Sequence, residues 1–232
     1  MTTTLPRFAP ATTDEWSVAM PLRKFRRTIN AMALVVSKDE SRPILTGLLF
    51  EPTADGGLRV VGTDSYRIAY ASLARDLTFD SKPDGERRSI VSGAALRNFL
   101  KVVPERSDTG STVTVTFQQP DRVRVELIIH DGTAFTASLP RIGGEFPQYR
   151  HFLEHDSTPV VPDGENDTGF NLAYLNYFYK MALAIGATSP TGDSPNPVRM
   201  ESHGSLKPAK LWINNRDADI LLTCAIMPIR VP

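Results

Sequence analysis

Five consecutive residues, Thr63 to Arg67, bring a hydroxyl, a carboxylate and a guanidinium together between two apolar runs. Such side chains can do two kinds of chemistry in this setting. In a turn, Asp64 can accept hydrogen bonds from nearby backbone N–H groups and pair with Arg67, so that the segment is a well-satisfied corner. The same donors and acceptors can instead line a pocket for a ligand. The residue types alone leave both interpretations open.

No group of residues in the sequence has the spacing of a catalytic or metal site. The histidines are scattered along the chain, at His130, His151, His155 and His203. The sequence contains neither a glycine-rich phosphate loop with a lysine nor a nucleophile elbow. We therefore predict a protein that is not an enzyme and that uses no metal or other cofactor.

The composition is that of an ordinary soluble globular protein. Of its 232 residues, 41% are hydrophobic and 22% are charged, and the 26 basic residues balance the 26 acidic ones. This balance argues against a wholly basic nucleic-acid binder, but it leaves room for a local basic face. The single cysteine, Cys224, suits a reducing compartment. Because the N-terminus lacks the apolar core of a signal peptide and no apolar run approaches the ~20 residues of a membrane span, we expect a cytoplasmic protein.

The polar corner is positioned by three expected strands, at 44–50, 58–61 and 68–70. The turn between the first two contains Asp-Gly and Gly-Gly, which permit positive φ angles. A further strand is expected at 16–20, and a helix begins at Pro21, where its apolar residues recur at spacings of three and four. The order is therefore strand, helix, strand, strand, strand.

This order recurs along the chain, which indicates an architecture of repeated units. The second unit is expected to comprise a strand at 89–91, a helix at 93–103 and strands at 113–117, 123–129 and 135–139. The third is expected to comprise a short strand ending at Gly169-Phe170, a helix capped by Asn171 and ending at Ile185, a mobile loop at 186–197, and strands at 198–202, 210–213 and 221–226. We expect a disordered tail at 1–14, a domain of two units at 15–153, a linker at 154–168 and the third unit at 169–232.

Basic residues lie opposite the apolar stripes of the predicted helices. The first helix carries Arg23, Lys24, Arg26 and Arg27, the second carries Arg97 and Lys101, and the third carries only Lys180. Two interpretations are open for these side chains. They can form an ordinary solvated surface, or they can contact the phosphates of nucleic acid independently of its sequence.

Several motifs resemble one known family. RPILTGLLFE, followed by VGTDSYRIAY, is similar to the central domain of the bacterial DNA polymerase III β sliding clamp. Phe146-Pro147-Gln148-Tyr149 resembles the segment that closes that domain, and the stretches 169–175 and 227–231 resemble the last part of the third clamp domain. The resemblance implies an α+β DNA-clamp fold, with helices on one face of curved antiparallel sheets, and a ring whose basic helices surround duplex DNA.

The resemblance also implies a pocket for short linear peptides of DNA polymerases and of other replication and repair proteins. Carried across by position, its residues are Leu45, Thr63, Ser65, Tyr66, Arg67, Ile68, Pro147, His151, Phe152, Ala225, Ile226, Met227, Pro228, Ile229 and Arg230. His151 stands where family members often carry arginine, and Phe152 replaces a smaller aliphatic residue. The implied partners further include double-stranded DNA, a clamp loader and other copies of the chain, and no membrane.

The chain departs from the family in its number of units. A bacterial clamp subunit has six units and closes its ring as a dimer, whereas this sequence predicts three, with the first domain and half of the third missing. Two hypotheses follow. The protein is a processivity factor that assembles into a homo-oligomeric ring on DNA, or it is a non-encircling adaptor or competitor that only binds clamp-interacting peptides.

Overall fold

The computed structural model describes residues 15–80, 87–105, 109–118, 121–153, 169–188, 198–202 and 207–229. Four predictions lie wholly or mostly outside these residues: the tail at 1–14, the linker at 154–168, the loop at 186–197 beyond residue 188, and the pocket residue Arg230. In the described part of the chain, no helix is long and apolar enough to cross a membrane.

The first unit has the predicted order. It comprises β1 (Trp16–Pro21), α1 (Leu22–Met32), β2 (Gly47–Pro52), β3 (Leu58–Thr63) and β4 (Arg67–Leu73). Pro21 is the N-cap residue of α1, where its missing N–H removes no helical hydrogen bond. The apolar stripe of α1 is fully buried, as its spacing predicts.

The second unit repeats this order. It comprises β6 (Ser89–Ser92), α2 (Gly93–Val102), β7 (Thr112–Gln118), β8 (Arg122–Ile128) and β9 (Ala134–Ile142). The side chain of Ser92 accepts a hydrogen bond from the backbone N–H of Ala95 and so caps α2.

The third unit comprises α4 (Leu172–Ile185), β10 (Arg199–Glu201), β11 (Ala209–Asn215) and β12 (Ile220–Ile226). Asn171 caps α4 as predicted, and Gly186 ends it at a positive φ of 73°. Of the short strand predicted to end at Gly169-Phe170, the structure describes only these two residues, and Gly169 forms an isolated antiparallel bridge with Ile229.

Three short elements were not predicted. Pro43–Thr46 forms the 3-10 helix η1, where we expected the second strand to begin at Ile44. Pro43 fixes φ and opens this helical turn, which delays the strand to Gly47. Thr78–Phe79 forms β5, outside the predicted strands, and Arg150–Leu153 forms the single turn α3. None of the three is long enough to produce a periodic pattern.

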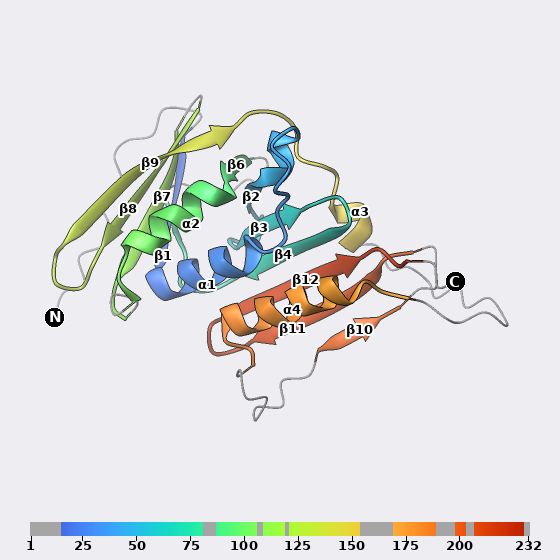
Figure 1. The fold of residues 1–232 in the computed structure, drawn as a ribbon. Helices are drawn as coiled ribbons and strands as arrows, with labels where there is room; N and C mark the ends of the chain where they lie inside the picture. The colour runs from blue at the N-terminus through green and yellow to red at the C-terminus, as the bar shows by residue number, and fades with distance from the viewer. Residues whose placement is uncertain are drawn as a thin grey trace.

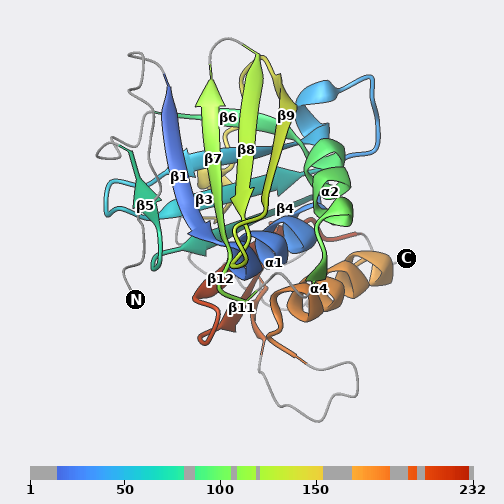
Figure 2. The ribbon, with the colours of Figure 1, turned by 90° about the vertical axis from the view of Figure 1, so that its left-hand side faces the viewer.

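The strands form one antiparallel arrangement in the order β10-β11-β12-β4-β3-β2-β6-β9-β8-β7-β1-β5. The first two units exchange their leading strands, because β1 pairs with β7 and β6 pairs with β2. The third unit extends the sheet of the first through the pairing of β12 with β4. Figures 1 and 2 show this side-by-side arrangement, in which β10 and β5 are the two outer strands.

Helices α1, α2 and α4 all cover one face of the strands (Figure 1), and the main core lies between the two layers. A second, smaller cluster lies on the opposite face. There the segment that follows β9 packs Phe146, Tyr149 and Leu153 against Leu49, Val61, Ile90 and Ala225 of the sheet. This cluster fixes the position of the segment and thereby shapes the surface beside the polar corner.

Candidate peptide-binding site

The polar corner between β3 and β4 is a hydrogen-bonded turn. Asp64 Oδ1 accepts the backbone N–H groups of Tyr66 at 3.0 Å and of Arg67 at 2.8 Å. The hydroxyl of Thr63 donates to the carbonyl of Arg67 at 2.8 Å. Ser65, at the apex, adopts a φ of 79°, which this dense bonding holds in place. The local interpretation of the corner is therefore correct.

The side chain of Arg67 points toward α4, which the sequence did not predict. Its guanidinium pairs with Asp64 Oδ2 at 2.6 Å and lies over the rings of Tyr174, at 4.7 Å, and Tyr177, at 4.2 Å, both on α4. Only 6% of the residue is exposed. The head group thus ties the corner to α4, while Arg67 also lines the cavity described next; its polar contact with a peptide stays a prediction.

A mostly apolar cavity of about 360 Å³ lies beside the corner, on the face that the helices leave uncovered. We call it the apolar cavity. Residues predicted for the peptide pocket supply most of its lining, namely Leu45, Thr63, Ser65, Tyr66, Arg67, Ile68, Pro147, Phe152, Ala225 and Met227. Three further residues, Gln148, Tyr149 and Pro208, complete the lining. The structure thus gathers three distant stretches of sequence around one space.

The strand pairing explains which predicted residues reach this space. Ala225 is the register partner of Ile68 across β12 and β4, so both side chains point to the same face. Ile226 is fully buried in the main core on the other face, because neighbouring residues of a strand alternate. Sequence motifs identified the last strand correctly but did not separate its two faces.

Other predicted pocket residues lie elsewhere. His151 lines a neighbouring cavity, and Pro228 and Ile229 follow β12 without lining the apolar cavity. Two of the added residues, Gln148 and Tyr149, belong to the Phe-Pro-Gln-Tyr motif and could have been included on that signal. Pro208 carries no comparable signal, since it enters the lining only because β11 pairs with β12.

The mouth of the apolar cavity exposes large side chains to solvent. Tyr66 is 59% exposed, Phe152 is 47% exposed and Met227 is 40% exposed. The backbone N–H of Met227 donates to the carbonyl of Tyr66 at 3.1 Å, which joins the third unit to the corner at the edge of the cavity. A concentration of exposed apolar surface around a cavity is typical of a binding site.

The basic residues on the helices divide into two groups. Lys24 and Arg26 are buried, so the prediction that they share one solvent-exposed basic face with their neighbours is wrong. The ammonium of Lys24 donates to Asp219 at 3.2 Å, and the guanidinium of Arg26 donates to the carbonyls of Leu100 and Val103 at the end of α2. Both side chains therefore join elements of the fold.

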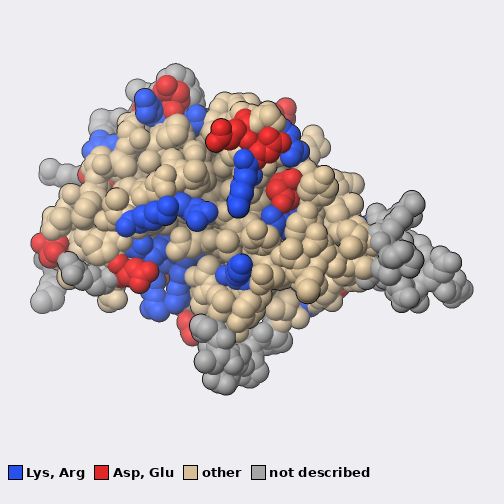
Figure 3. Space-filling model, viewed as in Figure 1, with Lys and Arg blue, Asp and Glu red and all other residues tan. Residues whose placement is uncertain are grey.

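The remaining basic side chains are at the surface. Arg23, Arg97, Lys101 and Lys180 are exposed, and Arg27 is half-buried. Figure 3 shows the face that carries α1, α2 and α4, with separate groups of Lys and Arg side chains and broad uncharged areas between them. The basic surface of the described helices is thus smaller than the sequence predicts.

The chain matches a family model described as the central domain of the DNA polymerase III beta subunit over residues 19–148. It is 29% identical over 139 residues to a beta sliding clamp of Chlamydia pneumoniae, a match that covers 60% of this chain and 34% of that protein. It is 26% identical over 184 residues to a beta sliding clamp of Streptococcus pneumoniae, covering 77% of this chain and 43% of the relative. The chain therefore spans less than half the length of the curated relatives that it matches.

Solved structures agree on the fold. The DNA polymerase sliding clamp of Bacillus subtilis superposes with a TM-score of 0.65 at 16% identity, covering 97% of this chain and 67% of that one. A sliding clamp of Pseudomonas aeruginosa, solved with a ligand, gives a TM-score of 0.65 at 18% identity, with coverage of 98% and 69%. The arrangement of repeated units is thus a clamp fold.

Proposed function

The chain belongs to the family of the DNA polymerase III beta subunit, and on this premise we propose that it is a sliding-clamp-like processivity factor. It binds duplex DNA without sequence specificity, recruits partner proteins through short peptides and catalyses no reaction. The apolar cavity carries the proposal, because units far apart in the sequence build it together and expose large apolar side chains around it.

The apolar cavity suits an extended peptide. Leu45, Ile68 and Ala225 offer apolar walls for the anchor side chains of such a peptide. Met227 is flexible and polarisable, so it can adapt to anchors of different shape. The partners that we propose are DNA polymerases, other replication and repair proteins that carry such peptides, and a clamp loader.

The exposed basic side chains of the helices support contact with DNA. Arg23, Arg97, Lys101 and Lys180 lie on helices that cover the same face, and Arg27 lies partly at that surface. Lysine and arginine side chains in such positions contact phosphates, and contacts of this kind permit sliding because they carry no sequence information.

Assembly into a homo-oligomer is part of this proposal. The first two units complete each other by exchanging β1 and β6, whereas in the described residues of the third unit no strand is exchanged. The two outer strands, β10 and β5, offer edges at which copies of the chain can meet.

The alternative is a non-encircling adaptor or competitor that uses only the apolar cavity. The burial of Lys24 and Arg26 favours it, because two of the seven side chains proposed to contact DNA serve the fold instead. The two functions differ in the binding of DNA, and they share the binding of peptides.

Peptide binding tests what the two functions share. A fluorescein-labelled peptide that carries leucine and phenylalanine anchors is titrated with the full chain, and we expect micromolar affinity in anisotropy measurements. Griselimycin, which is bound in a solved sliding clamp of Pseudomonas aeruginosa, serves as an unlabelled competitor. Absence of binding by a panel of such peptides and by griselimycin would refute the assignment of the apolar cavity.

A further inference from the structure

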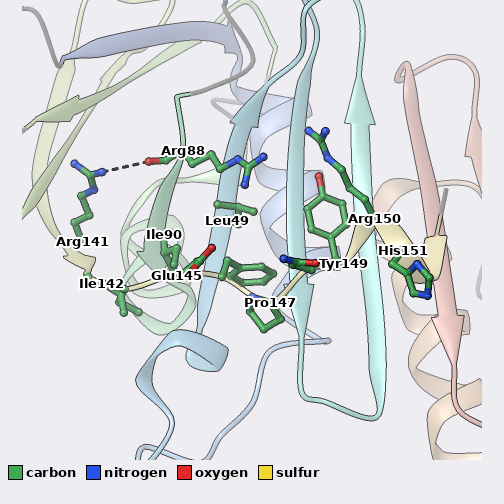
Figure 4. Close-up of a pocket in the computed structure, with 14 residues that line it drawn as sticks. Leu49, Arg88, Ile90, Arg141, Ile142, Glu145, Pro147, Tyr149, Arg150 and His151 are labelled. Carbon is green, nitrogen blue, oxygen red and sulfur yellow. Dashed lines mark hydrogen bonds between the residues drawn. The ribbon is translucent and has the colours of Figure 1, made fainter. Parts of the chain in front are cut away.

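Figure 4 shows the lining of a second cavity, of about 670 Å³. This cavity adjoins the apolar cavity, because the two share lining residues. We call it the basic cavity, because arginines from three elements or segments line it: Arg88 just before β6, Arg141 on β9 and Arg150 at the start of α3. His151 also belongs to its lining, and Glu145 is its one lining carboxylate. Leu49, Ile90 and Phe146 contribute apolar walls.

A buried carboxylate organises two of these arginines. Glu51 on β2 is 0% exposed, forms an ion pair with Arg150 and lies 3.6 Å from Arg88. It also accepts a hydrogen bond from the hydroxyl of Tyr149 at 2.8 Å. A carboxylate without solvent needs such partners, so Arg88 and Arg150 stabilise the fold. Their presence alone is therefore weak evidence for a ligand.

Arg141 is different. Its guanidinium donates to the backbone carbonyl of Arg88 at 3.2 Å, which directs the side chain toward this arginine without neutralising it. Among the described residues no carboxylate forms an ion pair with Arg141, although Glu145 lines the same cavity. The buried Glu51 pairs with Arg88 and Arg150, so each has an ionic partner within the fold. It does not balance the charge of Arg141, which is therefore available to a ligand.

The two cavities share one wall. Pro147, Gln148 and Tyr149 line both, so a peptide seated in the apolar cavity needs to pass only this short ridge to reach the basic cavity. Pro147 and Gln148 are exposed along the ridge, and Gly143 and Gly144 on the far side of the basic cavity carry no side chains that would cover it. The two spaces can therefore hold neighbouring parts of one extended chain.

We propose that the basic cavity binds acidic residues that flank the apolar anchors of the docking peptide, an inference that rests on the proposed function. Guanidinium groups bind carboxylates through paired, charge-assisted hydrogen bonds, which are stronger than neutral ones. The apolar cavity then sets affinity for the anchors, and the basic cavity selects partners whose docking segments carry glutamate or aspartate next to them.

Three labelled peptides test this selection with the full chain. They share the same leucine and phenylalanine anchors and differ in their flanks: three glutamates before the anchors, three glutamates after them, or glutamines on both sides. We expect one of the two acidic peptides to bind about fivefold to tenfold more tightly than the glutamine peptide at low salt. This advantage should shrink as the salt concentration rises.

Arg141→Gln is the decisive variant, because it spares the partners of Glu51. It should remove the advantage of the acidic peptide and leave the affinity for the glutamine peptide unchanged. Arg124→Gln is the matched control, since Arg124 is an exposed arginine that pairs with Glu126 on β8 and lines neither cavity. In Arg141→Glu, a peptide with a lysine flank should bind more tightly than one with a glutamate flank.

The outcomes separate this inference from the function on which it rests. Equal affinity for all three peptides overturns the inference and leaves the apolar cavity assigned. An acidic advantage that survives in Arg141→Gln also overturns it. If none of the peptides binds, the proposed function fails, and the inference fails with it.

Discussion

At the scale of single residues, the corner between β3 and β4 has two roles. Asp64 accepts backbone N–H groups and forms an ion pair with Arg67, as it would in an isolated turn. The same bonds hold Thr63 and Tyr66 at the wall of the apolar cavity and place the guanidinium of Arg67 between the corner and α4. The structural and the functional interpretation of this segment are therefore compatible.

Met227 provides the sharpest residue-scale prediction. Replacing it by alanine removes a flexible apolar wall of the apolar cavity, so we expect peptide affinity to fall by about tenfold, in line with ~1.4 kcal/mol of lost contact. Met200→Ala is the matched control, because Met200 is exposed to a similar extent, 43% against 40%, but lies on β10 and does not line that cavity.

Anisotropy titration of both variants with the same labelled peptide measures this difference. Equal losses in Met227→Ala and Met200→Ala would mean that the peptide does not occupy the apolar cavity. The stability of each variant is followed by thermal unfolding, so that a folding defect is not mistaken for a loss of binding.

At the scale of elements, the third unit is held to the first by more than the pairing of β12 with β4. Asp219, in the turn between β11 and β12, accepts hydrogen bonds from the backbone N–H groups of Ala74 and Arg75 and from the ammonium of Lys24. This one carboxylate thus joins α1 and the end of β4 to the last hairpin.

The lowered pKa of Asp219 makes the stability of the fold depend on pH. Burial by itself raises the pKa of this carboxyl, but the N–H of Arg75, the Lys24 ammonium and the N–H of Ala74 outweigh it, and the pKa is lowered. A carboxyl with a lowered folded-state pKa contributes stability that is present above its unfolded pKa, about 3.9, and is lost as the pH falls through the folded value.

Asp219→Asn should therefore lower the free energy of unfolding by about 2 kcal/mol at pH 7, because it removes hydrogen bonds to a charged group. The difference from the unmodified chain should shrink as the pH is lowered below about 4. Urea denaturation at pH 7 and pH 3 measures both values. A difference that stays constant with pH would show that the charge of Asp219 contributes nothing.

We predict opposite effects for substitutions of the exposed and of the buried basic residues on α1. Arg23 is exposed, so Arg23→Glu should weaken the binding of double-stranded DNA several-fold and leave stability within about 0.5 kcal/mol. Arg26 is buried and bonds to the last carbonyls of α2, so Arg26→Met should lower stability by about 2–3 kcal/mol with little effect on DNA binding by the folded protein.

Electrophoretic mobility shifts and chemical denaturation of each variant check this pair. Arg124→Glu is the control for charge, because its side chain alternates with buried residues of β8 and points away from the helices. Equal effects of Arg23→Glu and Arg124→Glu on DNA binding would argue against a DNA surface on the helices.

At the scale of the whole molecule, the open point is whether chains of this kind, with three units each, assemble into an oligomer. The fold has two units that complete each other and a third that extends their sheet, and its outer strands are β10 and β5. For a processivity factor we expect a defined oligomer by light scattering after size-exclusion chromatography, and retention on circular DNA that ends when the DNA is linearised. A strict monomer without such retention would favour the adaptor.

The sequence by itself determined the repeated units, because helices and strands follow local periodicity, caps and turns. The stripe of α1, the Asn171 cap of α4 and the strands around the corner are all set by residues close together in the chain. Likeness to the family motifs also pointed to most residues of the apolar cavity, since its lining comes from those motifs.

Only the tertiary structure decided which charged side chains are buried and which elements they contact. Lys24 and Arg26 fit the polar side of a helix by pattern, yet α1 is covered on that side by a hairpin and by the end of α2, which are distant in sequence. Arg67 likewise turns toward rings on α4, and the basic cavity joins residues from β6, β9 and α3. Burial of a charge depends on which distant elements pack around it, and no local pattern contains that information.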